Sequence, residues 1–152
     1  SSRRQRQMCI RDSFSYIFDI NNKSGRPRIN LIEINDNFIE QGIEVKPLKI
    51  KHRDWDILGY RINNFAYITD CSMIPDETLN TLYNLDLLIL ESLRYSSHEA
   101  HLSVDQAIEI SNKLKPKKTV LTHMSSELKY EDLLSYLPKN IVPGFDGMSI
   151  KI

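Results

Sequence analysis

Three strand-like runs of this sequence end directly on a side chain that can bind a metal ion. An apolar run over residues 65–69 ends on Asp70, and two further runs end on His52 and on His123. Because the carboxyl ends of strands in an α/β sheet are where ligand sites form, we expect these three side chains to converge at one edge of a sheet. The alternative is that they are three unrelated polar residues in loops.

The first half of the chain has the pattern of a strand meander. Residues 65–69 read as a strand buried on both faces, because the run is short, apolar and rich in β-branched and aromatic residues. Asn63-Asn64 predicts a hairpin turn before it, and Pro47 places the preceding strand at an edge or a bulge. The other strands expected here cover residues 14–20, 30–34, 36–40, 43–52 and 58–62.

The second half alternates strands with helices. Pro75 and the acidic residues after it predict a helix start, and the Ser103-x-x-Gln106 pattern predicts a capping box for a second helix that ends at Pro116. Residues 130–137 predict a third helix, and strands are expected over 86–90, 118–122, 141–143 and 148–152. The fold class is therefore α/β, with hairpin-paired strands first and strand–helix alternation second, which gives a mixed sheet.

Length and charge exclude several classes of protein. The 152 residues suit one domain, and basic and acidic residues balance at 20 each. A net charge of zero gives no long-range attraction to nucleic acid, so RNA as a partner is not indicated, and no apolar run is long enough to span a membrane. Two cysteines are too few for a disulfide framework, so we expect a cytoplasmic protein.

The first dozen residues differ in character from the rest. Residues 3–13, R-R-Q-R-Q-M-C-I-R-D-S, resemble the translation of a sequencing-library adaptor, and we interpret residues 1–12 as an artefact rather than as part of the fold. The alternative is a basic arm that binds nucleic acid or directs targeting. An adaptor joined to coding sequence implies that residues 13–152 are the C-terminal part of a longer domain.

The three candidate ligands suit a first-row divalent metal. Two imidazoles and one carboxylate are donors for Zn²⁺, Mn²⁺ or Fe. A metal held there would lower the pKa of a bound water towards neutrality and supply a hydroxide nucleophile. Cys71 follows Asp70 directly, so its side chain should point to the opposite face and fill a buried apolar position.

A loop after the strand over 86–90 brings further polar residues to the same edge. His101 could serve as a general acid or bind a phosphate, or it could be a solvated loop residue. Arg94 could bind an anionic substrate or pair with Glu91, and His98 is interpreted as a surface residue.

Several motifs together resemble one family. The order P-L-K-I-K-H, F-A-Y-I-T-D-C-S, L-I-L-E-S-L-R, H-E-A-H-L-S, V-L-T-H-M-S and F-D-G-M is similar to the C-terminal half of metallo-β-lactamase-fold hydrolases. Within that superfamily it is most similar to the branch of phosphoribosyl cyclic phosphodiesterases, relatives of the tRNA 3′-processing endonucleases. The resemblance implies the C-terminal half of an αββα sandwich that binds two divalent ions, Zn²⁺ or Mn²⁺.

The resemblance also implies a role for each site residue. His52 would bind one metal, His123 the other, and the Asp70 carboxylate would bridge them. His101 matches the histidine of the branch that lies near the substrate phosphate, and Asp146 matches the aspartate of its closing motif.

Two departures from the branch affect these expectations. The H-x-H-x-D-H signature, which supplies the remaining ligands, does not occur in this sequence, and Ser126 stands where the branch often has a second histidine. We therefore expect the 152-residue chain alone to be inactive, with the sheet face that the missing half would cover left open.

The function expected of the intact protein is hydrolysis of a phosphodiester by a binuclear metal site. The partner would be a small phosphorylated substrate, with no membrane partner, and a homodimer is compatible with the sequence. The alternatives are a thioester or lactone hydrolase of the same fold, or a non-catalytic binding module.

Overall fold

The computed structural model describes residues 14–19 and 29–151, and these fall in two units that divide between Asn35 and Asp36. In the first unit, α2 is a single helical turn over Ser15–Phe18 with no buried residue. The strand predicted over 14–20 is therefore wrong for these residues, and residues 30–34 form no strand either. An alternating apolar pattern is a weak predictor by itself, because the structural context decides whether a short run becomes a strand. Residues 1–12, interpreted as an artefact, lie outside the described residues.

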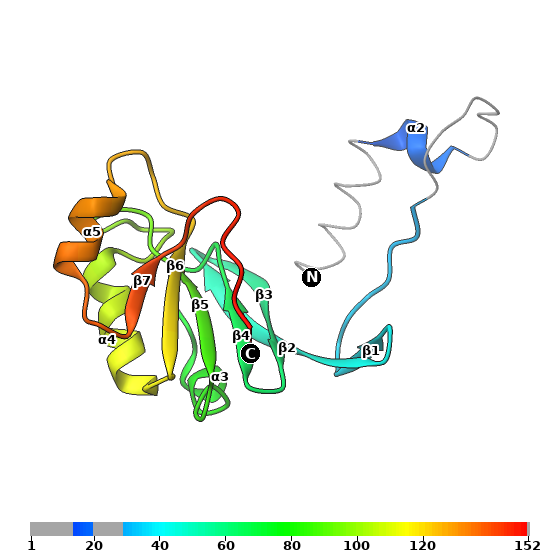
Figure 1. Cartoon of the computed structure of the whole chain (residues 1–152). Helices are drawn as coiled ribbons and strands as arrows, with labels where there is room; N and C mark the ends of the chain where they lie inside the picture. Colours follow the sequence, from blue (N-terminus) through cyan, green and yellow to red (C-terminus); the bar gives the residue numbers. More distant parts are fainter. Residues whose placement is uncertain (1–13, 20–28, 152) are drawn as a thin grey trace. The chain divides into compact units, whose positions relative to one another are not determined.

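The second unit is built on a seven-stranded sheet with the strands in sequence order (Figure 1). Its first four strands pair antiparallel and its last four pair parallel, so the mixed sheet predicted from the sequence is confirmed. The strands are β1 Phe38–Glu40, β2 Ile43–His52, β3 Trp55–Ile62, β4 Phe65–Ile68, β5 Leu87–Glu91, β6 Lys118–Thr122 and β7 Ile141–Pro143.

Local sequence explains the meander. Ile62 pairs with Phe65 across the turn predicted at Asn63-Asn64, and Asn63 adopts the left-handed conformation that such tight turns require. β1 pairs with β2 only as far as Val45, so Pro47 lies where β2 has a neighbour on one side alone. Proline cannot donate a backbone hydrogen bond, and this edge position confirms the interpretation made from the sequence.

Three helices connect the parallel strands: α3 Asp76–Leu79, α4 Val104–Leu114 and α5 Tyr130–Tyr136. The predicted capping box is present, because the Ser103 hydroxyl accepts from the Gln106 N–H while the Gln106 side chain accepts from the Ser103 N–H. Lys115 ends α4 in the left-handed conformation, directly before Pro116.

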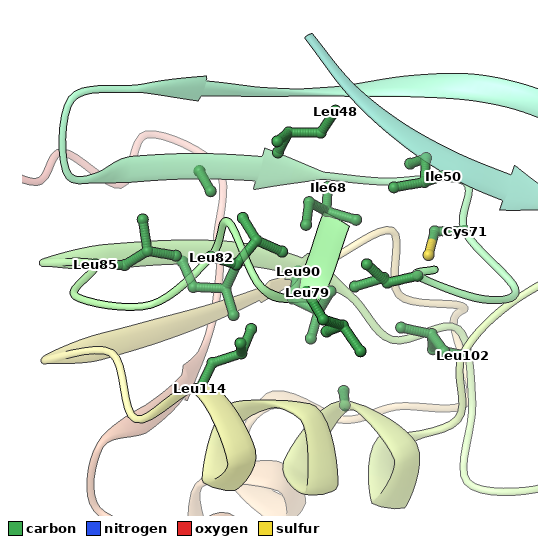
Figure 2. Packing of buried hydrophobic residues seen from close by; sticks show 14 of the residues in the cluster. Leu48, Ile50, Ile68, Cys71, Leu79, Leu82, Leu85, Leu90, Leu102 and Leu114 are labelled. Atoms are coloured by element: carbon green, nitrogen blue, oxygen red, sulfur yellow. The ribbon is translucent and has the colours of Figure 1, made fainter. Parts of the chain in front are cut away.

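The hydrophobic core lies between the sheet and α4 (Figure 2). Alternate residues of β4 divide between its two faces: Ala66 and Ile68 are buried in this core, whereas Phe65 and Tyr67 face the other way. Leu90 of β5 and Leu114 of α4 join the same cluster. This packing fixes the sheet, and with it the positions at which the strands end.

The other face of the sheet is less completely covered. Tyr67 is 39% exposed, so the prediction that β4 is buried on both faces is wrong. A cleft on this face is lined by Phe65, Tyr67, Ile89 and Val120 together with the C-terminal segment, where residues 148–151 form no strand although one was predicted. The open face agrees with the fold of half a sandwich. No helix within the described residues is long and apolar enough to cross a membrane.

Candidate metal centre

The strand directions bring four strand ends to one edge of the sheet. β2 and β4 are both antiparallel to β3, so they run the same way, and β5 and β6 are parallel to β4. His52 ends β2, Glu91 ends β5, His123 follows β6 directly, and Asp70 follows β4 by two residues. Topology alone therefore places four polar side chains together.

Backbone contacts hold Asp70 beside the end of β2. The Ser72 N–H donates to the Lys51 carbonyl at 2.7 Å, and the Lys51 N–H donates to the Met73 carbonyl at 2.9 Å. Asp70 and His123 both adopt the left-handed conformation, with φ of 58° and 57°. Aspartate and histidine are among the residues that tolerate this region, and such backbone conformations are concentrated at functional sites.

Asp70 and His123 form an exposed pair. Oδ1 of Asp70 lies 3.3 Å from Nε2 of His123, and the two side chains are 52% and 37% exposed. Two ligands that each lie about 2.0–2.1 Å from one tetrahedral ion are themselves about 3.3 Å apart. The separation of these two atoms is therefore the one expected of neighbouring ligands of a single ion.

Glu91 and His101 form a buried pair next to the exposed one. The Glu91 carboxylate is 0% exposed, and its Oε1 accepts from the Leu102 N–H at 2.9 Å. Its Oε2 lies 3.1 Å from Nδ1 of His101. Both carboxylate oxygens are thus engaged, which is the condition for burying such a group, and the His101 ring is held in one orientation.

The four histidines of the chain form one cluster centred on His101. Its ring centroid lies 5.0 Å from that of His52, 5.0 Å from that of His123 and 5.1 Å from that of His98. The structure thus brings His52, Asp70 and His123 to one edge of the sheet, with His101 in ring contact with the other two histidines.

The donor atoms fit a divalent metal. One ligand atom from each of Asp70, Glu91, His101 and His123 lies within 4.8 Å of the others, and imidazole nitrogens with carboxylate oxygens are the donors of Zn²⁺ and Mn²⁺ sites. His52 lies next to this group through its ring contact with His101 but does not belong to it. Glu91 belongs to it although the sequence-based set omitted it.

Glu91 was missed although its sequence signal was the same as that of the others. It ends the apolar run over residues 86–90, as His52 and His123 end theirs. The rule that located the three candidate ligands therefore also locates Glu91.

The remaining candidates lie around the cluster with different contacts. Arg94 donates to the carbonyls of Ser96 and Ser97, so its predicted alternative pairing with Glu91 is not formed. Asp146 is exposed and lines the same cleft as His123, outside the group of possible ligands.

His98 is partly buried against His101 and is not simply the surface residue that the sequence suggested. Ser126, for which the family resemblance supplied no role, is exposed three residues after His123.

Cys71 does not contribute a thiolate. Its side chain is 0% exposed in the core, as predicted from its position after Asp70. Burial, together with the nearby Glu91 carboxylate, raises the pKa of the Cys71 thiol to about 12. The thiol therefore stays protonated at neutral pH, and the ligand set consists of nitrogen and oxygen atoms.

A mixed sheet with imidazoles and carboxylates at the carboxyl ends of its strands is the arrangement expected of a metallo-β-lactamase-fold domain. Residues 7–124 match the beta-lactamase superfamily domain, and the chain belongs to this family. Its members are mostly metal-dependent hydrolases, and divalent metals are implied by the fold. The matched range begins inside residues 1–12, whose origin as an adaptor stays a prediction.

Similar proteins of known structure place the chain within this superfamily. It is 31% identical to a diphosphatase from the PhnP family, with a TM-score of 0.85 over 93% of this chain and 53% of that one. The short form of human tRNase Z shares the fold at 21% identity, with a TM-score of 0.57 over 76% of this chain and 46% of that one. The predicted metallo-β-lactamase fold is therefore confirmed, and the likeness to tRNase Z, at 21% identity, is one of fold alone.

A relative found by sequence comparison is named as a transferase rather than as a diphosphatase. The chain is 34% identical over 143 residues to an octanoyltransferase of Porphyromonas gingivalis, and the alignment covers 91% of this chain but 29% of that protein. The chain thus spans about half of the diphosphatase and less than a third of the octanoyltransferase.

Proposed function

We propose that this chain is the C-terminal part of a metal-dependent phosphodiesterase whose substrate is a small cyclic phosphate or nucleotide-like diester. The observation that supports this most strongly is the pair Asp70 and His123 at the carboxyl edge of the sheet, whose Oδ1 and Nε2 atoms lie 3.3 Å apart with Glu91 and His101 beside them. The 31% identity to a diphosphatase supports chemistry at phosphorus. Two divalent ions, Zn²⁺ or Mn²⁺, are the cofactors of this proposal.

Each residue of the site has a distinct proposed task. His52, Asp70 and His123 would bind the ions, with the Asp70 carboxylate shared between them and further ligands supplied by sequence outside this chain. Divalent ions bound there would lower the pKa of a water ligand and neutralise charge on the phosphate oxygens. Arg94 and Asp146 are proposed to contact the substrate from the edge of the site.

His101 is the proposed general acid. Nδ1 of His101 lies 3.1 Å from the buried Glu91 carboxylate, so Nδ1–H is the donor of that bond and Nε2 is the nitrogen available to the substrate. In its protonated form, Nε2–H can give a proton to the leaving oxygen when the phosphorus–oxygen bond breaks. Glu91 keeps the ring in place for that transfer.

Turnover of bis(p-nitrophenyl) phosphate by the full-length protein tests this function. We expect hydrolysis with Mn²⁺ or Zn²⁺, loss of activity with a chelator, and a decrease by orders of magnitude in Asp70→Ala. Asp76→Ala is the matched control, because the Asp76 side chain is 92% exposed and its only ion pair among the described residues is with Lys113, at 3.9 Å. No hydrolysis by the metal-loaded wild type would contradict the proposal, and activity in the 152-residue chain alone would contradict its dependence on further ligands.

The main alternative is hydrolysis of a thioester or lactone, and the 34% identical octanoyltransferase is the observation that favours it. Comparing an octanoyl thioester with the phosphodiester under the same metal conditions separates the two. Faster turnover of the thioester would favour the alternative. Binding of metal without turnover of either substrate would favour a binding module.

A further inference from the structure

His98 is the one histidine of the cluster without a proposed task, and its hydrogen bonding defines its tautomer. Nδ1 of His98 accepts a hydrogen bond from the Ala100 N–H at 3.2 Å. A backbone N–H can only donate, so Nδ1 carries no proton. A neutral imidazole has one donor and one acceptor, and Nε2 of His98 therefore carries the hydrogen.

The position of this ring is fixed relative to the metal centre. The rings of His98 and His101 have centroids 5.1 Å apart and an interplanar angle of 34°. Glu99, the next residue, forms an ion pair with Arg53, which directly follows His52. The loop that carries His98 is thus attached to the end of β2 as well as to β5.

The Nε2–H of His98 is not used in any hydrogen bond among the described residues. Its Nδ1, by contrast, is used by its own loop. His98 is partly buried and its ring lies against His101, next to the candidate metal ligands. A donor there is suited to an anionic oxygen, because hydrogen bonds to charged acceptors are the stronger ones.

We propose that His98 contacts the substrate, with its Nε2–H donating a hydrogen bond to an anionic oxygen of a phosphate group bound beside His101. This inference rests on the proposed function for the identity of the anion. It adds a substrate-binding residue to the site. The competing explanation is that His98 only orders its own loop through the bond to Ala100.

Two substitutions separate these explanations. His98→Asn keeps an acceptor near the position of Nδ1 and removes the Nε2–H, whereas His98→Gln places an amide donor near the position of Nε2 and removes the acceptor. If His98 contacts the substrate, His98→Asn should weaken phosphate binding and His98→Gln should largely preserve it. A role limited to the loop predicts the reverse.

The experiment is calorimetric titration of inorganic phosphate into the full-length protein loaded with Mn²⁺. We expect His98→Asn to weaken phosphate binding by about tenfold or more, and His98→Gln to stay within about threefold of wild type, because one charge-assisted hydrogen bond contributes this much. Unchanged binding in His98→Asn, greater loss in His98→Gln, or no phosphate binding by the wild type would overturn the inference.

Two further measurements keep this inference distinct from the proposed function. A ¹H–¹⁵N spectrum of the histidine rings should show His98 as the Nε2–H tautomer, and the Nδ1–H tautomer would overturn the inference. Sensitivity of phosphate binding to His98→Asn without phosphodiester turnover would support His98 and contradict the phosphodiesterase. Normal phosphodiester turnover and normal phosphate binding in His98→Asn would support the phosphodiesterase and contradict the role of His98.

Discussion

Oε2 of Glu91 lies 3.1 Å from Nδ1 of His101, and the carboxylate that makes this contact is fully buried. The other oxygen of Glu91 accepts from the Leu102 N–H, so the strand end and the histidine loop are joined through one side chain. The position of His101 is therefore set by β5, a strand in the middle of the parallel part of the sheet.

Replacing Glu91 by Gln should reduce turnover of the full-length protein by about 10–100-fold, the usual effect of removing an orienting partner. The amide nitrogen cannot accept, so either the Leu102 N–H or the His101 Nδ1–H loses its acceptor. Two measurements test this: kcat with a phosphodiester substrate, and a ¹H–¹⁵N spectrum of the His101 ring, which reports on its hydrogen bond to residue 91. Glu109→Gln, an exposed substitution on α4, is the control. Equal kcat values for the two variants would contradict the orienting role.

Replacing Asp70 by Asn should weaken Mn²⁺ binding by more than the roughly 10–100-fold typical of an orienting residue, because a proposed ligand loses its charge. The melting temperature of the metal-free protein should change little, since the side chain is 52% exposed. Calorimetric titration of the metal measures the first effect, with Asp76→Asn as control. An unchanged affinity in Asp70→Asn would mean that Asp70 is not a ligand.

Replacing Ser103 by Ala should cost about 1 kcal/mol of folding free energy, because the hydroxyl accepts from the Gln106 N–H at the start of α4. Urea unfolding of Ser103→Ala against Ser135→Ala measures it. Ser135 is exposed on α5 and its hydroxyl contacts only the Glu131 carbonyl among the described residues, so its loss should be nearly neutral. Equal unfolding midpoints would show that the cap contributes nothing.

The phenol of Tyr136 should titrate above its ordinary range. Its hydroxyl donates to Oδ1 of Asp105 at 2.6 Å, and this bond to a carboxylate raises the pKa of Tyr136. The contribution to stability is present below the pKa of an unfolded tyrosine and is lost as the pH rises through the folded pKa. In an NMR titration, Asp105→Asn should lower the pKa of Tyr136 and Asp132→Asn should not. A Tyr136 pKa unaffected by Asp105→Asn would contradict the assignment.

The site could be predicted from the sequence to the extent that it follows strand ends. His52, Asp70 and His123 were found because an apolar run stops at a polar residue, and the parallel topology brings such positions together. Glu91 has the same signal but was considered only as a partner for Arg94. The contact of His98 with His101 has no periodic signal, because it depends on how an irregular loop folds back.

The fold could be predicted where a segment has a neighbour to pair with. The strands β2 and β4 to β7 and the cap of α4 agree with their sequence patterns, whereas β3 begins at Trp55, before the predicted range 58–62. The strand predicted over 14–20 is wrong because residues 15–18 form the short helical turn α2 instead. The exposed face of β4 was missed because an apolar run alone does not tell which layer covers it.

Anomalous X-ray diffraction at the absorption edge of the bound metal, from crystals of the full-length protein grown with Mn²⁺ or Zn²⁺, tests the central claim most directly. We predict peaks at the carboxyl edge of the sheet, with one ion about 2.0–2.2 Å from both Oδ1 of Asp70 and Nε2 of His123. No peak at this edge, or a metal held elsewhere with Asp70 and His123 unligated, would contradict the account.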